Sequence, residues 1–415
     1  MKIERLLFFD NVRTDETISL GIRIYNAVMH SREDHVNPTV LEGYYELQRR
    51  LLRNQDEGAG TGSYWENYVY KKVAESENRF SLAAEQGRQD TAIRQLAAGD
   101  AADLRELVSG NWEEVVRRIA DGRPSVCTTP YAGPVSERLQ SVAEALQEAE
   151  AEGVTAALEN HYHKYCCGIL GKYRAFTWEG RLKGVEHPDP ITFEDLVGYE
   201  RQKEQLIRNT TAFLRGKRAN NVLLYGDKGT GKSSSVKALL NRFAPDGLRL
   251  ISIQKDKIFD VSAIMDSVAN RGGRFIIFID DLSFEETEIE YKRFKSILEG
   301  GVELQPENVL IYVTSNRRNL VKEMWGDRGE NGEVHVNDGI QERLSLADRF
   351  GLTITFGAPD KKLYNEIVKA IAKREGLQMD EEQLLAEANI WDLRQTSRSG
   401  RSARQFITHL AGEER

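Results

Sequence analysis

The 415-residue sequence predicts an α/β fold in its second half, with a mainly parallel sheet covered by helices. Three observations lead to this prediction. Short apolar runs alternate with helical segments after residue 189. A glycine-rich loop follows the first of these runs, and a pair of acidic residues follows the third. The first half has a helical texture, and so does the C-terminal end.

Five apolar runs have the length and composition of buried strands. They are Asn221–Tyr225, Leu248–Ile253, Arg274–Ile279, Val309–Thr314 and Leu352–Phe356. Helical patterns separate them, so tight hairpins cannot connect them. We therefore expect parallel pairing with helices on both faces of the sheet.

The turn His187–Pro190 separates two regions that differ in composition and hydrophobic periodicity. Before it, Glu, Ala, Arg, Leu and Gln recur with helical periodicity, which predicts a helical domain over residues 1–188. The alternating pattern predicts an α/β core over residues 189–357. Helical periodicity alone continues from there, which predicts a small helical lid over residues 358–415.

Composition and charge indicate an ordinary soluble protein, with 40% hydrophobic and 29% charged residues. No run approaches the roughly 18 apolar residues of a membrane span. The first ten residues lack a secretory signal pattern, and three cysteines suit a reducing compartment, so we expect a cytoplasmic protein without a membrane partner. Residues 1–188 carry 23 basic and 29 acidic side chains and residues 189–415 carry 34 and 36, so neither half is a basic nucleic-acid footprint.

Residues Gly226–Ser233 spell G-x-x-x-x-G-K-S, a phosphate-binding loop between a predicted strand and a predicted helix. Glycines let the backbone wrap phosphates, and the helix N-terminus favours an anion. Lys232 is expected to reach the β- and γ-phosphates, and Ser233 to bind Mg²⁺. A chance glycine-rich turn is the alternative. The predicted cofactor-binding residues of the loop are Gly226, Asp227, Lys228, Gly229, Thr230, Gly231, Lys232, Ser233 and Ser234.

Acidic and amide side chains follow two of the predicted strands. Asp280 and Asp281 come directly after residues 275–279, at the strand end where ligands bind in parallel sheets. We expect Asp280 to share Mg²⁺ with Ser233, and Asp281 to orient the attacking water. Asn316 follows the next strand and is predicted to contact the γ-phosphate or the water; a turn-forming Asn is the alternative.

In this order, these segments resemble the motifs of AAA+ ATPases across residues 191–410. The resemblance implies a P-loop NTPase fold with a helical lid, ATP and Mg²⁺ as cofactors, and hydrolysis at a subunit interface. It further implies an adenine-side segment, a first sensor at Asn316, a trans-acting arginine finger and a second sensor, for which Arg401 is the alternative to Arg404. The residues implied are Val197, Gly198 and Tyr199 for adenine, Arg349 for the finger and Arg404 for the second sensor.

Residues 220–226, 280–284, 314–318 and 345–351 resemble one uncharacterised bacterial AAA+ family, known as domain of unknown function 815. A homo-oligomeric remodeller is therefore expected, whose helical domain recognises an unidentified protein, with nucleic acid as the alternative partner. Two positions depart from AAA+ patterns. Asp281 stands where Glu is usual and is one methylene shorter, which favours slow hydrolysis or a switch. Residues 254–260 contain Phe259 without the glycine of a threading loop, which counts against peptide threading. A slow ATP/ADP switch or loader is the alternative, and a small-molecule kinase a weaker one.

The sequence has one metal-like cluster, in which His161, His163, Cys166 and Cys167 form H-x-H-x-x-C-C. Structural zinc sites use better separated ligand pairs. A packed helix is therefore the favoured interpretation.

Overall fold

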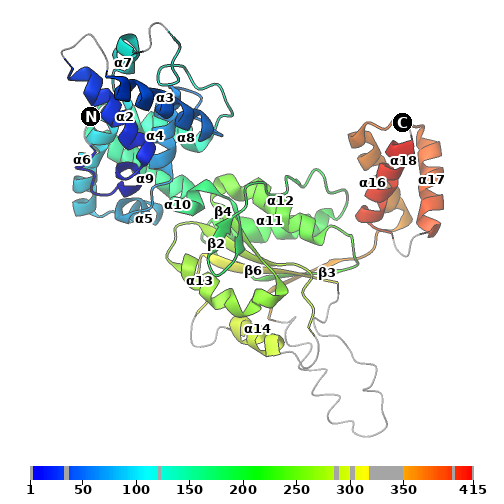
Figure 1. The fold of residues 1–415 in the computed structure, drawn as a ribbon. Coiled ribbons are helices and arrows are strands. Elements are labelled where there is room, and N and C mark those ends of the chain that lie inside the picture. Colours follow the sequence, from blue (N-terminus) through cyan, green and yellow to red (C-terminus); the bar gives the residue numbers. More distant parts are fainter. Residues whose placement is uncertain are drawn as a thin grey trace. The chain divides into compact units, whose positions relative to one another are not determined.

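The computed structural model describes residues 3–31, 37–119, 123–284, 289–299, 304–316, 349–394 and 398–413. The chain divides into two compact units (Figure 1). Unit 1 comprises Met1–Tyr173 and Arg271–Gly273, and unit 2 comprises Arg174–Asn270 and Arg274–Arg415. Within these described ranges, no helix has the length and apolar character needed to cross a membrane.

Unit 1 is helical, as predicted. Its helices are α1 (Asp10–Arg13), α2 (Glu16–Met29), α3 (Pro38–Arg53), α4 (Tyr64–Ala74), α5 (Arg79–Glu85), α6 (Thr91–Val108), α7 (Trp112–Ile119), α8 (Glu137–Leu146), α9 (Ala151–Tyr165) and α10 (Gly168–Lys172). They enclose one apolar core in which Tyr44, Trp65, Phe80 and Tyr162 are fully buried. The sequence also determines where α4 begins, because reciprocal hydrogen bonds between Ser63 and Glu66 cap its N-terminus.

Unit 2 contains a seven-stranded sheet of order β2-β1-β4-β5-β6-β3-β7. The strands are β1 (Ala175–Trp178), β2 (Leu182–Gly184), β3 (Val222–Gly226), β4 (Leu248–Ile253), β5 (Arg274–Ile279), β6 (Val309–Ser315) and β7 (Leu352–Phe356). Only β1 and β2 pair antiparallel; all other neighbours are parallel. All five predicted strands are present, and the predicted α/β class is confirmed.

The sheet begins earlier in the chain than expected. Strands β1 and β2 lie before residue 189, and unit 2 starts at Arg174. Both strands are short, with four and three residues, and they form one edge of the sheet. Ala175–Thr177 of β1 pair with β4, and β2 pairs with β1. The long-range pairing with β4 leaves little trace in the local sequence.

Helices cover both faces of this sheet. They are α11 (Glu200–Leu214), α12 (Lys232–Phe243), α13 (Val261–Ala269) and α14 (Ile289–Glu299), with 3₁₀ turns η1 (Ala244–Asp246) and η2 (Lys255–Asp260). Figure 1 shows α11 and α12 over one face and α13 and α14 over the other. The predicted lid forms from α16 (Lys361–Glu375), α17 (Glu381–Arg394) and α18 (Gly400–Glu413), around an apolar core of its own.

Candidate nucleotide-binding site

The loop from β3 to α12 has a backbone that only glycine can adopt at its first position. Gly226 has φ +139°, and a Cβ there would overlap the carbonyl oxygen of Phe356 on β7. Gly229 and Gly231 also have positive φ, at +75° and +93°. Gly231 is the residue before α12, so the unpaired N–H groups of that helix open onto the loop.

Gly226→Ala is therefore expected to destabilise unit 2 by at least about 2 kcal/mol, because it combines backbone strain with a backbone clash. Chemical denaturation followed by circular dichroism measures this loss. Gly247→Ala is the matched control: Gly247 has φ +88°, but nothing lies within 4 Å of an added Cβ. If both variants lost the same stability, the close approach to Phe356 would have no energetic importance.

Lys232 is the first residue of α12, and its side chain is buried. Its Nζ donates to the carbonyl oxygens of Gly226 (2.9 Å) and Asp227 (2.7 Å) and to Oδ1 of Asn316 (3.3 Å). Burial lowers the pKa of Lys232, although the carboxylates of Asp227, Asp281 and Asp280 oppose that shift. The structure thus brings the loop lysine and Asn316 together.

Ser233 and Asp280 form an oxygen-donor pair. The Ser233 hydroxyl donates to Oδ1 of Asp280 over 2.5 Å, and the Thr314 hydroxyl donates to the same oxygen. A hydroxyl and a carboxylate are hard ligands of the kind that Mg²⁺ prefers. These residues come from the first turn of α12, the end of β5 and the end of β6. The donor set therefore fits Mg²⁺.

Asp281 is held in a left-handed conformation, with φ +51°. Its backbone N–H donates to the Thr314 hydroxyl over 2.8 Å, and Nδ2 of Asn316 donates to its carboxylate. Asn316 therefore contacts Lys232 through its oxygen and Asp281 through its nitrogen. Non-glycine residues with positive φ are rare and often functional, and Tyr199 at +59° is a second one in this site.

The predicted adenine-side segment lies where the sheet meets the lid. Val197 packs against the apolar core of the lid, and Gly198 has φ +80°, with Leu363 filling the space of a side chain. The Tyr199 hydroxyl donates to the carbonyl of Gly357 over 2.7 Å. Buried Lys203, which the sequence reasoning missed, donates to the carbonyl of Leu196 and supports this segment.

These residues border a cavity of about 830 Å³ in unit 2. Its lining includes Val197, Tyr199, Lys228–Ser235, Asp280, Asp281, Asn316, Arg401 and Arg404. Three other residues predicted to bind nucleotide, Gly198, Gly226 and Asp227, are not among the lining residues. A Cβ on Gly229 would lie 3.1 Å from Cβ of Arg401, so the start of α18 closely approaches the phosphate loop. Arg401 and Arg404 thus both remain candidates for the second sensor.

Arg349 lies apart from this group. It is exposed and precedes buried Phe350 at the entry to β7. It does not line the cavity of its own chain. The residues directly before it, Ala347 and Asp348, lie outside the described residues. The other predicted catalytic residues, Lys232, Asp280, Asp281, Asn316 and Arg404, all line the cavity.

The metal-like segment forms the end of α9 and the turn after it. His161 is buried, and neither ring nitrogen has a hydrogen-bond partner. His163 is exposed, while the Cys167 thiol donates to Glu85. Among the described residues, no group of three or more His, Cys, Asp or Glu side chains could hold a metal ion. Burial, assisted by the charge of Arg138, lowers the pKa of His161 from 6.5 to about 3.

This histidine makes stability depend on pH. The native state keeps His161 neutral while the unfolded chain binds a proton, so its contribution is complete above pH 6.5 and is lost between pH 6.5 and about 3. We expect a slope of up to about 1.4 kcal/mol per pH unit in urea unfolding between pH 6 and 4. His161→Gln should flatten this slope, whereas exposed His163→Gln should not. An unchanged slope in His161→Gln would exclude this assignment.

Comparisons with known proteins find a matching family and several relatives. Residues 171–414 match the profile of a family described as protein of unknown function (DUF815). Among curated proteins, the replication factor C large subunit of Methanococcus vannielii is 23% identical over 201 residues, covering 48% of this chain and 36% of that protein. AAA-ATPase At3g28610 of Arabidopsis thaliana is 26% identical over 162 residues, covering 35% and 33%.

The chain thus spans about a third of the length of these curated relatives. A solved structure of the Thermotoga maritima RuvB Holliday junction branch migration motor matches 53% of this chain and 63% of its own, at 18% identity and a TM-score of 0.36. The family profile covers more than half of the chain, from just before β1 to the end of the lid. The chain therefore belongs to the DUF815 family, within the AAA+ P-loop ATPases.

Proposed function

We propose that this protein binds and hydrolyses ATP with Mg²⁺ and works as an oligomer that remodels a macromolecular partner. The observation that carries the proposal is the convergence of Lys232, the Ser233–Asp280 pair and Asn316 on one cavity beside two lid arginines. A small-molecule kinase would leave those arginines unexplained.

Each residue has a defined task in this chemistry. Lys232 neutralises phosphate charge, and the N–H groups at the start of α12 bind phosphate oxygens. Ser233 and Asp280 would hold Mg²⁺, which neutralises developing charge when bound. Asp281 and Asn316 orient the attacking water. Arg349 is exposed outside its own cavity, which supports a role on the phosphate of a neighbouring subunit.

The alternative function is a slow ATP/ADP switch or loader that recruits a protein or nucleic acid. One contact favours this alternative. Asn316 donates a hydrogen bond to the carboxylate of Asp281, so the carboxylate proposed to orient the attacking water already has a partner. The 3₁₀ turn η2 also favours it over threading. Phe259 in that turn is partly buried, with Arg293 packed 5.0 Å from its ring centre.

Asp280→Asn tests the proposed metal site. Because the substitution removes a negative ligand, half-maximal ATP hydrolysis should need about 10- to 100-fold more Mg²⁺. A titration of Mg²⁺ against steady-state phosphate release measures this shift. Asp266→Asn on α13 is the control, since Asp266 is exposed and does not line the cavity. Equal Mg²⁺ requirements for wild type and Asp280→Asn would contradict the assignment.

A further inference from the structure

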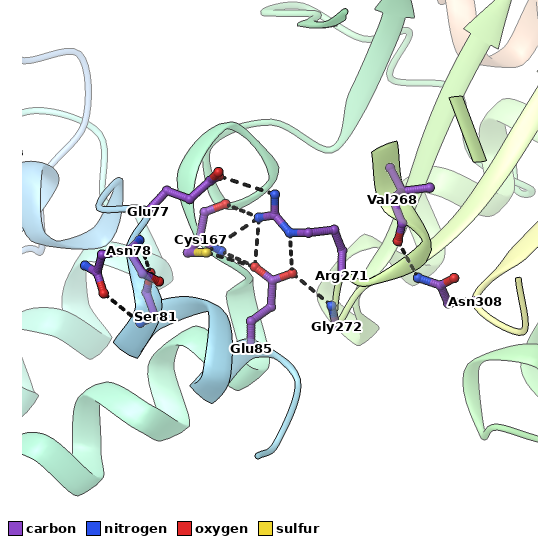
Figure 2. Close-up of polar contacts among 9 residues, drawn as sticks. All are labelled: Glu77, Asn78, Ser81, Glu85, Cys167, Val268, Arg271, Gly272 and Asn308. Carbon is purple, nitrogen blue, oxygen red and sulfur yellow. Dashed lines mark hydrogen bonds and ion pairs between the residues drawn. The ribbon is translucent and has the colours of Figure 1, made fainter. Parts of the chain in front are cut away.

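The turn Arg271–Gly273, between α13 and β5, belongs to unit 1 although unit 2 surrounds it in sequence. Figure 2 shows the contacts that hold it. Arg271 donates from Nε and Nη2 to the two carboxylate oxygens of Glu85, each over 2.9 Å. The backbone N–H of Gly272 donates to the same carboxylate over 2.9 Å. The Glu85 side chain is 0% exposed and that of Arg271 14%.

Two further residues of unit 1 complete this arrangement. Cys167 donates to Glu85 from its N–H (2.9 Å) and its thiol (3.0 Å), and its carbonyl accepts from Arg271. Glu77 forms a second ion pair with Arg271, at 3.3 Å. Burial alone would raise the pKa of Glu85, but Arg271, Cys167 and Gly272 outweigh it and keep that pKa below its ordinary value. We name these five residues, Glu77, Glu85, Cys167, Arg271 and Gly272, the turn clamp.

Steric fit at Gly272 is independent of these charges. A Cβ on Gly272 would overlap the backbone carbonyl of Glu85. Only glycine therefore allows the turn to approach α5 this closely. The clamp thus requires an arginine that can form a bidentate ion pair, followed by a glycine, and residues 271–272 provide both.

The turn leads directly into the strand that carries the proposed metal ligand. Strand β5 follows Gly273, and Asp280 follows β5. Phe275–Ile279 are buried, and β5 pairs with β4 and β6 along its length. On the other side of the turn, Nδ2 of Asn308 donates to the carbonyl of Val268 over 2.8 Å (Figure 2). A strand of this length spans about 20 Å and is too tightly packed to absorb a displacement locally.

We propose that the turn clamp couples the nucleotide site to unit 1 through β5. Nucleotide bound at Ser233 and Asp280 changes the position of β5, and the clamp transmits this change to α5 and α10. The inference rests on the proposed function, since it needs nucleotide at that site. Linkage is reciprocal. If bound nucleotide changes the affinity of unit 1 for a partner, that partner changes the affinity for nucleotide by the same factor.

Hydrogen–deuterium exchange of the full chain, with and without ADP and Mg²⁺, tests this coupling. In wild type, nucleotide should slow exchange in α12 and also in α5 and α10. Glu85→Gln, which removes the charge, and Gly272→Ala, which adds the clash, should keep the α12 response and lose most of the α5 response. Glu57→Gln is the matched control, because Glu57 pairs with buried Arg138 elsewhere in unit 1; it should respond like wild type.

Two results would overturn the coupling: a wild-type response confined to α12, or a full α5 response in both clamp variants. If α12 itself did not respond in wild type, the proposed function would fall and the inference with it. Should Glu85→Gln lose its helical circular dichroism, Arg271→Lys replaces it. That variant keeps the positive charge but loses the two-pronged bond, and it should weaken the α5 response.

Discussion

Lys232→Ala is expected to reduce ATP hydrolysis by at least about 100-fold, because it removes a buried positive charge from the head of the phosphate loop. Nζ has three oxygen contacts, two of them to loop carbonyls, so the ammonium is already positioned. Preorganised charge costs little rearrangement during the reaction, which is why its loss should be large. Steady-state phosphate release under saturating ATP and Mg²⁺ measures the effect.

Lys237→Ala is the matched control for this variant. Lys237 also lies on α12, but it is partly exposed, pairs with Asp189 and does not line the cavity. It should retain wild-type hydrolysis. A Lys232→Ala protein with wild-type turnover would remove the phosphate loop from the mechanism.

Arg349→Ala should lower hydrolysis by about 1000-fold while ATP affinity stays near wild type. The reason is the position of Arg349, which is exposed and absent from the lining of its own cavity. An arginine placed there can act on a phosphate only if another subunit presents that phosphate. Phosphate release and ATP titration on the same sample separate turnover from binding. Arg208→Ala on α11 is the control, being exposed and outside the cavity lining.

Mixing two inactive variants tests the shared site more sharply. Lys232→Ala subunits keep the finger, and Arg349→Ala subunits keep the phosphate loop. A mixed assembly therefore contains interfaces where an intact loop meets an intact finger, and hydrolysis should return on mixing. If the mixture stayed as inactive as its components, while both variants assembled normally, Arg349 would not act in trans.

Local chemistry explains which parts of the site the sequence predicts. The strand, glycine loop and helix around Lys232 are contiguous, and Asp280 ends an apolar run, so their placement follows from short-range patterns. The sequence contains only a weak indication that Lys203 is buried and supports the site. Its spacing of three residues from buried Leu206 places it on the inner face of α11, but a carbonyl partner at Leu196 emerges only from the folded turn.

Features that depend on contacts between residues far apart in the sequence could not be predicted from local patterns. Glu85 and Arg271 are 186 positions apart, and nothing in either local sequence links them. Strand β1 depends likewise on pairing with β4, and β2 on pairing with β1. The left-handed backbone of Asp281 has the same origin, because Thr314 on β6 and Asn316 directly after β6 hydrogen-bond to Asp281. Local propensity alone would assign none of these.

The most direct test of the central claim is the rate of ATP hydrolysis per protomer, measured for the wild-type protein with Mg²⁺ over a wide range of protein concentration. A site completed by a neighbouring subunit predicts a rate per protomer that rises with concentration and then levels off as assembly saturates. A rate that stayed at the Lys232→Ala background at every concentration, with ATP bound, would contradict hydrolysis at a shared site.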